Sequence, residues 1–353
     1  MLKYLTAGES HGKALLAILD GIPSGLKVDP AKINQELKRR QKGYGRGKRM
    51  LIEQDKAEIL SGLKNGLTLG SPIGILIKNR DFSIETLPSV VSPRPGHADL
   101  AGLLKYGFKD VRNVLERASA RETTCRVGIG AICKIFLSEF NIRISSRVLC
   151  IAGESSPKAM RDKIAVAKES EDTVGGILEV IAKGVPCGLG SYVQPARRLN
   201  ARLAEAIMSI PGIKAVAFGL GFAYAYKFGS ECHDAIYYSK GKSLPAGRQG
   251  YFRKTNNAGG IEGGISNGED IVIRACMKPI STLLKPLDSV NINTKKSSRA
   301  AVERSDICVV EAAGVIAESA YAFVLSDALL EKFGSDSLSD IKKSYQDYRK
   351  RIR

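Results

Sequence analysis

The sequence predicts an α+β fold on three observations. Segments with helical spacing of apolar residues and segments rich in β-branched residues do not alternate regularly, as they would in a doubly wound α/β fold. Glycine makes up 36 of 353 residues and clusters along the whole chain, which indicates one site assembled from many loops. Because we find no repeat and no clear linker, we expect one domain over 1–335 and a basic tail over 336–353.

Three helices are predicted from the residues at their ends. The first begins at Asp29 and Pro30, a capping residue followed by proline in the first turn. The second begins near Ser119, where apolar residues then recur every four positions. The third spans about 315–333, with a single apolar stripe and a glycine directly after it. Asp327 lies on that stripe, and a carboxylate there either needs a partner or reaches water.

Strands are predicted where β-branched and apolar residues gather near glycines. The candidates are Ile75 to Lys78, Gly176 to Ala182, Ala215 to Phe218 and Glu269 to Cys276. The segment 243–250, rich in glycine, proline and polar residues, is predicted to be a surface loop.

The net charge of +18 fits a nucleic acid, an anionic surface or a polyanionic small molecule. Many arginines stand singly beside glycines, which suits phosphate or carboxylate binding by paired hydrogen bonds. A nucleic-acid-binding domain more often has a basic stripe with interleaved aromatic residues, whereas here aromatics are 6% and tryptophan is absent. We therefore expect a small anionic substrate and no nucleic acid.

The seven cysteines form no C-x-x-C pair, which argues against a zinc site or a disulfide framework, and we expect reduced core residues and no metal. The N-terminus lacks an apolar region typical of a signal peptide, and uncharged apolar runs fall short of the ~18 residues of a membrane span. We expect a cytoplasmic protein without a membrane contact.

Two of the three histidines lie on turns that could carry chemistry. His11 stands among small residues in Gly8-Glu9-Ser10-His11-Gly12-Lys13, which fails the spacing of a Walker A loop. His97 follows two prolines and a glycine, and Asp99 is close enough to orient its ring. From the residues alone, each histidine is either structural or a proton-transfer group.

Arginines, lysine and hydroxyls gather near two helix ends and after one strand. Arg40 and Arg46 lie at a helix C-terminus and in the following glycine loop, where they either complement the helix dipole or close on an anion. Arg112 and Arg117 precede another helix, where they form either a salt-bridged face or an anion site. The run 278–282 brings a lysine and two hydroxyls together, which suits a phosphate.

Together these segments resemble the chorismate synthase family, in the family's order, over roughly 1–335. The matching pieces are Gly8 to Gly12, Arg39 to Arg46, Arg94 to Asp99, Arg117 to Thr123, Asn257 to Gly268, Lys278 to Thr282, and Arg304-Ser305-Asp306 through Asp327. The resemblance implies a β-α-β sandwich, assembled as a homotetramer.

The resemblance also implies the reaction. The family converts 5-enolpyruvylshikimate 3-phosphate (EPSP) to chorismate and phosphate, an anti-1,4-elimination that requires reduced FMN without net redox change and ends the shikimate pathway. By motif position, His11 would protonate the departing phosphate, His97 would stabilise the reduced flavin at N1, and Asp327 would act in a proton relay near N5.

The same resemblance implies the binding residues. Arg40, Arg46 and Arg112 would hold the substrate's phosphate and carboxylates, or NADP in members that reduce their own flavin. The FMN contacts would be Arg117, Ala118, Ser119, Pro211, Gly212, Gly263, Lys278, Pro279, Ile280, Ser281, Thr282 and Arg304. NADPH would enter only if this enzyme is bifunctional.

Overall fold

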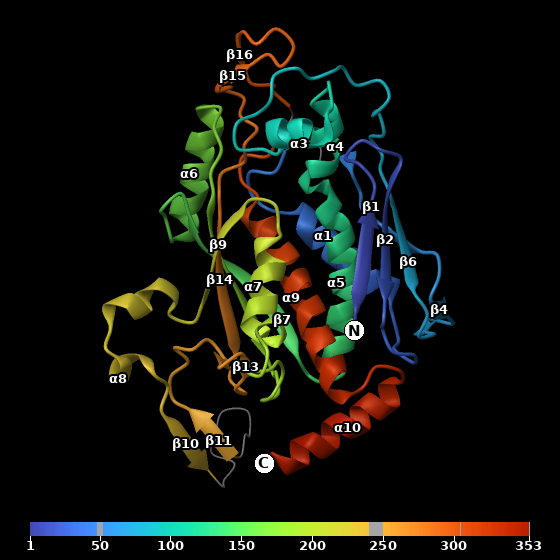
Figure 1. Cartoon of the computed structure of the whole chain (residues 1–353), viewed down its shortest axis with the longest axis vertical. Helices are drawn as coiled ribbons and strands as arrows, with labels where there is room; N and C mark the ends of the chain where they lie inside the picture. Colours follow the sequence, from blue (N-terminus) through green and yellow to red (C-terminus); the bar gives the residue numbers. More distant parts are fainter. Residues whose placement is uncertain (48–51, 240–249, 304, 353) are drawn as a thin grey trace.

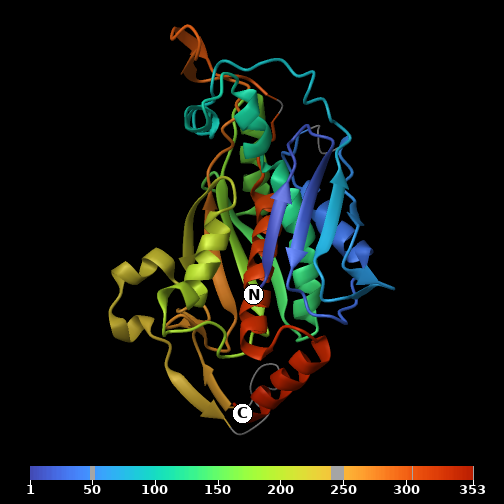
Figure 2. The same cartoon turned by 45° about the vertical axis from the view of Figure 1, so that its right-hand side comes forward.

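The structure, a computed structural model, describes residues 1–47, 52–239, 250–303 and 305–352. Two four-stranded sheets enclose a layer of helices (Figures 1 and 2). Every strand pairing in both sheets is antiparallel, so helices and strands need not alternate along the chain. The α+β fold and the β-α-β sandwich are thereby confirmed. The loop predicted at 243–250 lies almost wholly outside the described residues.

The N-terminal sheet has the order β1-β2-β6-β3, with β1 at Lys3–Ala7, β2 at Ala14–Asp20, β6 at Ile73–Lys78 and β3 at Ala57–Ile59. Along β2, burial alternates as the strand period of two requires. Leu15 and Leu19 point into the core, while Leu16 and Ile18 are exposed on the outer face. This sheet confirms the strand predicted at 75–78.

The second sheet has the order β7-β8-β14-β9, with β7 at Arg143–Ile151, β8 at Gly176–Lys183, β14 at Ile271–Met277 and β9 at Ile213–Phe218. Three of these strands were predicted. Strand β7 was missed because its serines and arginines obscure the apolar pattern, although its exposure does alternate. Helix α6 (Pro157–Glu169) packs against β7.

The helical layer contains α1 (Pro30–Gln41), α5 (Thr123–Ser138), α7 (Leu199–Met208) and α9 (Val310–Phe333). Asp29 caps α1 by accepting from Ala31 N, as predicted. The single stripe predicted on α9 is wrong, because 18 of its 24 residues are buried. A helix packed between two layers is buried around most of its circumference. By length and composition α9 could also cross a membrane, but 83% of its most apolar window is buried inside the protein.

The centre of the helical layer holds a buried ion cluster around Glu318 on α9. Its carboxylate is fully buried and accepts from Arg39 of α1 at 2.8 Å, Lys134 of α5 at 2.5 Å and Ser146 of β7 at 2.6 Å. Burial raises the pKa of Glu318, but hydrogen bonds from Arg39 and Lys134 outweigh it and hold the pKa below its usual range. One side chain thus joins three elements to α9.

Helices α5 and α9 approach each other closely where Gly130 faces Ser319. A Cβ on Gly130 would lie 2.2 Å from the Ser319 Cβ, so this crossing requires glycine.

The two ends of the sandwich carry different additions (Figure 1). One end has α3 (Asp99–Tyr106), α4 (Arg112–Ala118) and the hairpin of β15 (Asp288–Val290) and β16 (Ser297–Arg299). At the other end the basic segment predicted as a tail forms α10 (Leu338–Arg351), whose Tyr345 ring packs on Phe140 and Phe333. The remaining elements are β4 (Leu63–Lys64), β5 (Leu67–Thr68), η1 (Ala120–Glu122), η2 (Pro195–Arg197), η3 (Gly221–Tyr226), α8 (Gly229–Cys232), β10 (Ile236–Ser239), β11 (Gly250–Arg253), β12 (Ile261–Glu262) and β13 (Ile265–Ser266).

All seven cysteines are free. Four are buried, as expected for core residues, whereas Cys187 and Cys276 are exposed. Burial raises the pKa of the Cys133 thiol to about 12, so this side chain stays protonated and apolar.

Candidate active site

His11 lies in the loop that joins β1 to β2, and two neighbours fix this loop. The Ser10 backbone N donates to the carbonyl of Glu116 at 3.0 Å. The Asn79 side-chain amide donates to the Gly12 carbonyl at 2.7 Å. Both contacts are made by the loop backbone on either side of His11. They therefore fix the backbone position of the histidine independently of its side chain.

The imidazole of His11 faces two carboxylates. Its Nδ1 lies 2.9 Å from Oε1 of Glu116, and its Nε2 lies 3.9 Å from Oδ2 of Asp81. Glu116 is buried, which raises its pKa, but hydrogen bonds from the ring and backbone of His11 outweigh burial and lower it. Glu116 is therefore ionised at neutral pH and restrains the ring.

Helix α4 supplies two arginines beside this loop. The guanidinium of Arg112 donates to the Pro88 carbonyl at 3.1 Å and pairs with Glu303 at 2.9 Å. Its buried NH1 has no hydrogen-bond partner among the described residues. Arg117 donates to the carbonyls of Gly8 and Thr6 at 2.8 and 2.9 Å, so it closes the edge of β1 against α4.

Arg40 is buried and hydrogen-bonds to the segment 120–123, which follows α4. Its guanidinium donates to Thr123 Oγ1 at 3.1 Å and to the Ala120 carbonyl at 2.9 Å. Burial lowers its pKa to about 10, so it remains charged at neutral pH. On the other side of this segment Ser119 Oγ donates to Ser10 Oγ at 3.2 Å, which joins the predicted cofactor residue to the His11 loop.

The glycine loop after α1 hydrogen-bonds to the segment 305–308 and packs closely against it. The Gly45 carbonyl accepts from Ile307 N at 2.8 Å, and a Cβ on Gly45 would lie 2.8 Å from Ile164. Arg46 pairs with Asp306 at 3.1 Å, and its buried Nε has no hydrogen-bond partner within the described ranges. Arg304, a predicted FMN contact, lies outside the described residues.

His97 is oriented by a second buried carboxylate. Its Nδ1 lies 2.5 Å from Asp99 Oδ1, as the sequence spacing indicated. Arg94 forms a bidentate ion pair with the same carboxylate. Its Nε donates to Asp99 Oδ2 at 2.8 Å, and its NH2 donates to Asp99 Oδ1 at 3.0 Å. Burial raises the pKa of Asp99, but the hydrogen bonds from His97 and Arg94 outweigh it and hold the pKa well below its usual range.

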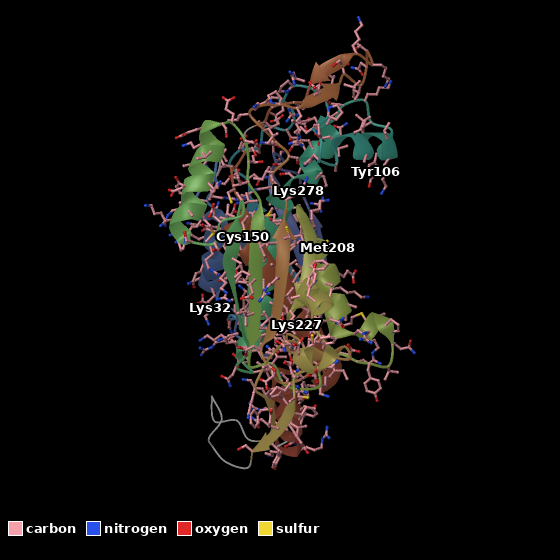
Figure 3. The ribbon with its side chains drawn as sticks, turned by 90° about the vertical axis from the view of Figure 1, so that its left-hand side faces the viewer. Lys32, Tyr106, Cys150, Met208, Lys227 and Lys278 are labelled. Atoms are coloured by element: carbon pink, nitrogen blue, oxygen red, sulfur yellow. The ribbon has the colours of Figure 1, made fainter. Side chains whose placement is uncertain are left out.

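The predicted phosphate-binding run 278–282 lies against the His97 loop. Arg94 NH1 donates to Thr282 Oγ1 at 2.7 Å, and the Lys278 ammonium donates to the Gly96 carbonyl. The Lys278 backbone N donates to the Gly212 carbonyl at 2.9 Å, so the segment 211–212 is adjacent as well. Figure 3 shows Lys278 near the upper end of the second sheet.

The His11 group and the His97 group lie at the same end of the molecule. His97 immediately precedes α3, and His11 is bound by α4. These two helices pack together through a small separate core of Val90, Leu103, Val111 and Val114. That end, at the top of Figure 1, is the candidate site.

Two predicted site residues are not brought to this end. Asp327 accepts from Leu2 N at 2.6 Å and pairs with Arg202 of α7. It lies 17 residues after Val310, or about 25 Å along α9. Gly263 lies between β12 and β13, at the other end of β14 from Lys278, and a seven-residue strand spans about 23 Å. Within one chain, neither contacts the groups around His11 or His97.

The contacts of Asp327 are structural, and this can be tested. We expect Asp327→Asn to leave turnover within about threefold of wild type and to destabilise the fold by about 1 kcal/mol, since a charged hydrogen bond to the N-terminal strand is weakened. Activity assays and urea unfolding measure both effects. A hundredfold loss of turnover at unchanged stability would restore the proton-relay role implied for Asp327.

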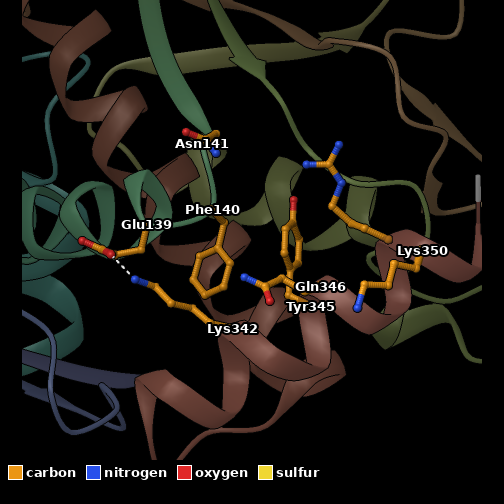
Figure 4. A pocket seen from close by; sticks show the side chains of 8 residues that line it. Glu139, Phe140, Asn141, Lys342, Tyr345, Gln346 and Lys350 are labelled. Atoms are coloured by element: carbon orange, nitrogen blue, oxygen red, sulfur yellow. Dashed lines mark hydrogen bonds and ion pairs between the residues drawn. The ribbon is translucent and has the colours of Figure 1, made fainter. Parts of the chain in front are cut away.

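A cavity elsewhere in the molecule holds none of the predicted site residues. It has a volume of about 430 Å³ between α10 and the end of α5, and Figure 4 shows its lining. Of its four charged lining residues, Glu139 and Lys342 pair with each other at 2.5 Å, and the other two are Arg349 and Lys350.

Comparison with known proteins decides the family. A sequence model of the chorismate synthase family matches residues 2–330. The chain belongs to the chorismate synthase family. It is 53% identical to the chorismate synthase of Thermoanaerobacter pseudethanolicus over 350 residues, covering 98% of both chains. It is 49% identical to that of Aquifex aeolicus over 394 aligned positions, covering 98% of this chain and 97% of the other.

A solved structure agrees with the sequence relatives. A crystal structure of chorismate synthase superimposes with a TM-score of 0.81 at 42% identity, covering 99% of this chain and 98% of that one. The protein is therefore an enzyme of the chorismate synthase type, a lyase. The predicted family and fold are confirmed.

Sequence reasoning missed some residues that build the site. Glu116 was given no role, because nothing in its sequence neighbourhood indicates contact with a loop 105 positions earlier. Asp306 and Arg94 stood inside motifs that supported the resemblance but were given no role. Only the fold shows that Asp306 meets Arg46 and that Arg94 joins Asp99 to Thr282.

Proposed function

We propose that the protein converts EPSP to chorismate and phosphate by anti-1,4-elimination, with reduced FMN and without net redox change. The observation that carries the proposal is His11 held on Glu116 beside Arg112, together with Arg46 on the glycine loop after α1. Arg112 and Arg46 each keep one buried guanidinium nitrogen without a hydrogen-bond partner in the described part of the chain. Such nitrogens suit the phosphate and carboxylates of an anionic substrate.

In this proposal the chain's own residues position the substrate and protonate the leaving phosphate. Arg112 and Arg46 bind its negative charges, with Arg40 supporting the segment behind them. His11 delivers a proton to the phosphate oxygen as the carbon–oxygen bond breaks. The net charge of +18 favours the encounter with a polyanion.

The donor set fits a flavin phosphate. Lys278 and the hydroxyls of Ser281 and Thr282 follow the end of β14, beside Gly212 and the His97 loop. The FMN would be held by Arg117, Ala118, Ser119, Pro211, Gly212, His97 and residues 278–282. When bound, reduced FMN would supply transient electron density that helps expel phosphate and, at N5, a base for the ring proton that the elimination removes.

Anaerobic phosphate release from EPSP tests the proposal. With FMN present, we expect release when dithionite is added and none when the flavin stays oxidised. A parallel arm with NADPH in place of dithionite shows whether the enzyme reduces its own flavin. Equal release with and without reduced flavin would overturn the proposal.

We also propose a cytoplasmic homotetramer. Exposed apolar side chains support self-association: Leu5, Leu16 and Ile18 share the outer face of the N-terminal sheet. A contribution from Gly263 to a flavin site would have to come from another copy, since Gly263 does not reach the site of its own chain.

Charge on that sheet face should weaken assembly. We expect the double variant Leu5→Lys and Ile18→Lys to lower the molar mass measured by light scattering after size exclusion. Val193→Lys, at an equally exposed position elsewhere, should leave the mass unchanged. An unchanged tetramer mass in the double variant would place the interface on another surface.

A further inference from the structure

A single buried carboxylate holds His11 at two points. Glu116 Oε1 lies 2.9 Å from the ring Nδ1, and Glu116 Oε2 accepts from the His11 backbone N at 2.8 Å. The carboxylate is 3% exposed and belongs to α4, whose backbone also accepts from Ser10. Both the ring and the backbone of the histidine are therefore fixed relative to the same helix.

This geometry selects one form of the ring. A neutral imidazole carries its proton on either nitrogen, and an ionised carboxylate only accepts. Nδ1 must therefore carry the proton next to Glu116, which leaves Nε2 as the nitrogen that exchanges protons. Nε2 lies 3.9 Å from Oδ2 of Asp81, whose side chain is 30% exposed against 2% for Glu116.

The ring of His97 also faces a buried carboxylate, but its Nδ1 lies 3.1 Å from Arg94 NH2 as well. Asp99 contacts its Nδ1 and is paired with Arg94 through two hydrogen bonds. Glu116 has Arg112 at 3.8 Å, and Arg112 also pairs with Glu303. The negative charge of Glu116 is therefore paired less closely with an arginine than the negative charge of Asp99.

We propose that Glu116 is the positioning residue of His11: it holds the ring with the proton on Nδ1 and reserves Nε2 for the substrate. Its effect on turnover rests on the proposed function, whereas its effect on the ring does not. Removing the partner that fixes a histidine tautomer can cost several orders of magnitude in rate when the geometry is otherwise intact.

The ring form can be measured by NMR on protein labelled with ¹⁵N-histidine. The chain has three histidines, so His97 and His233 serve as references in the same spectrum. Spectra are recorded at a pH high enough for all three imidazole rings to be neutral. We expect the Nδ1–H form for His11 in the wild type.

Glu116→Gln should invert that form. Its single amide oxygen is needed by the His11 backbone N–H, so the amide NH₂ faces Nδ1 and favours the Nε2–H form. Glu116→Ala should give a mixture, and Asp81→Asn should keep Nδ1–H. Unchanged His97 signals show that the variants are folded. A wild-type His11 in the Nε2–H form, or an Nδ1–H form retained in both Glu116 variants, would overturn the proposal.

Kinetics separate positioning from general structural damage. We expect Glu116→Gln to lower kcat for phosphate release at least about tenfold with KM within about threefold, because substrate contacts are unchanged. Glu122→Gln, at the end of η1 and paired with Arg126, should keep wild-type kcat. If the ring form inverts but the wild type releases no phosphate, the proposed function fails while the positioning role stands. If kcat is unaffected although the form inverts, the positioning role fails.

Discussion

His11→Ala and His97→Ala are each expected to lower turnover of EPSP at least about 100-fold. Loss of a proton-transfer group typically costs this much or more. His11 is the ring beside Arg112, whose buried NH1 lacks a hydrogen-bond partner among the described residues, and the His97 loop lies against the segment that would hold the flavin phosphate. Phosphate release under saturating substrate and reduced FMN measures kcat directly.

His233→Ala is the matched control for both, since this third histidine is exposed and remote from either group. Its kcat should equal that of wild type. Normal turnover in His11→Ala would remove the proton donor from the account, and normal turnover in His97→Ala would remove the flavin contact.

Glu318→Ala should destabilise the fold by about 3–5 kcal/mol. Removing this fully buried carboxylate takes a charged hydrogen bond from Lys134 and from Arg39, which keep only Glu36, and each such bond contributes about 1.5–3 kcal/mol. Here the Lys134 ammonium and the Arg39 guanidinium would lose the carboxylate that joins α1 and α5 to α9. Urea unfolding followed by circular dichroism measures the free energy of unfolding.

Glu139→Ala is the control, because its ion pair with Lys342 is partly exposed and should contribute under about 1 kcal/mol. A loss below 1 kcal/mol in Glu318→Ala would contradict the cluster's role. The pH dependence has a definite sign. The pKa of Glu318 is lowered from 4.5 on folding, so its contribution is present above that pH and is lost as pH falls through the folded-state value.

Much of the fold could be predicted because its signals are local. The cap and proline at the start of α1, and the β-branched runs of β6, β8, β9 and β14, depend on neighbouring residues only. The basic C-terminal segment was different. It forms α10 because Tyr345 finds the rings of Phe140 and Phe333, and these contacts are set by the tertiary fold.

The site was predicted in parts, for the same reason. Motif order identified both histidines, and the spacing of two residues identified Asp99 as the partner of His97. Asp327 attracted attention as a carboxylate on an apolar helix, but it anchors the N-terminal strand and α7. A charge in an apolar pattern shows that a partner exists and does not show whether that partner is a substrate or another helix.

A titration of FMN with and without EPSP tests most directly whether flavin and phosphorylated substrate share the end of the fold that carries α3 and α4. We predict that EPSP tightens FMN binding at least about tenfold in the wild type, within the range of coupling between adjacent sites, and that Arg112→Ala abolishes the tightening. An FMN affinity that is the same with and without EPSP would contradict the account.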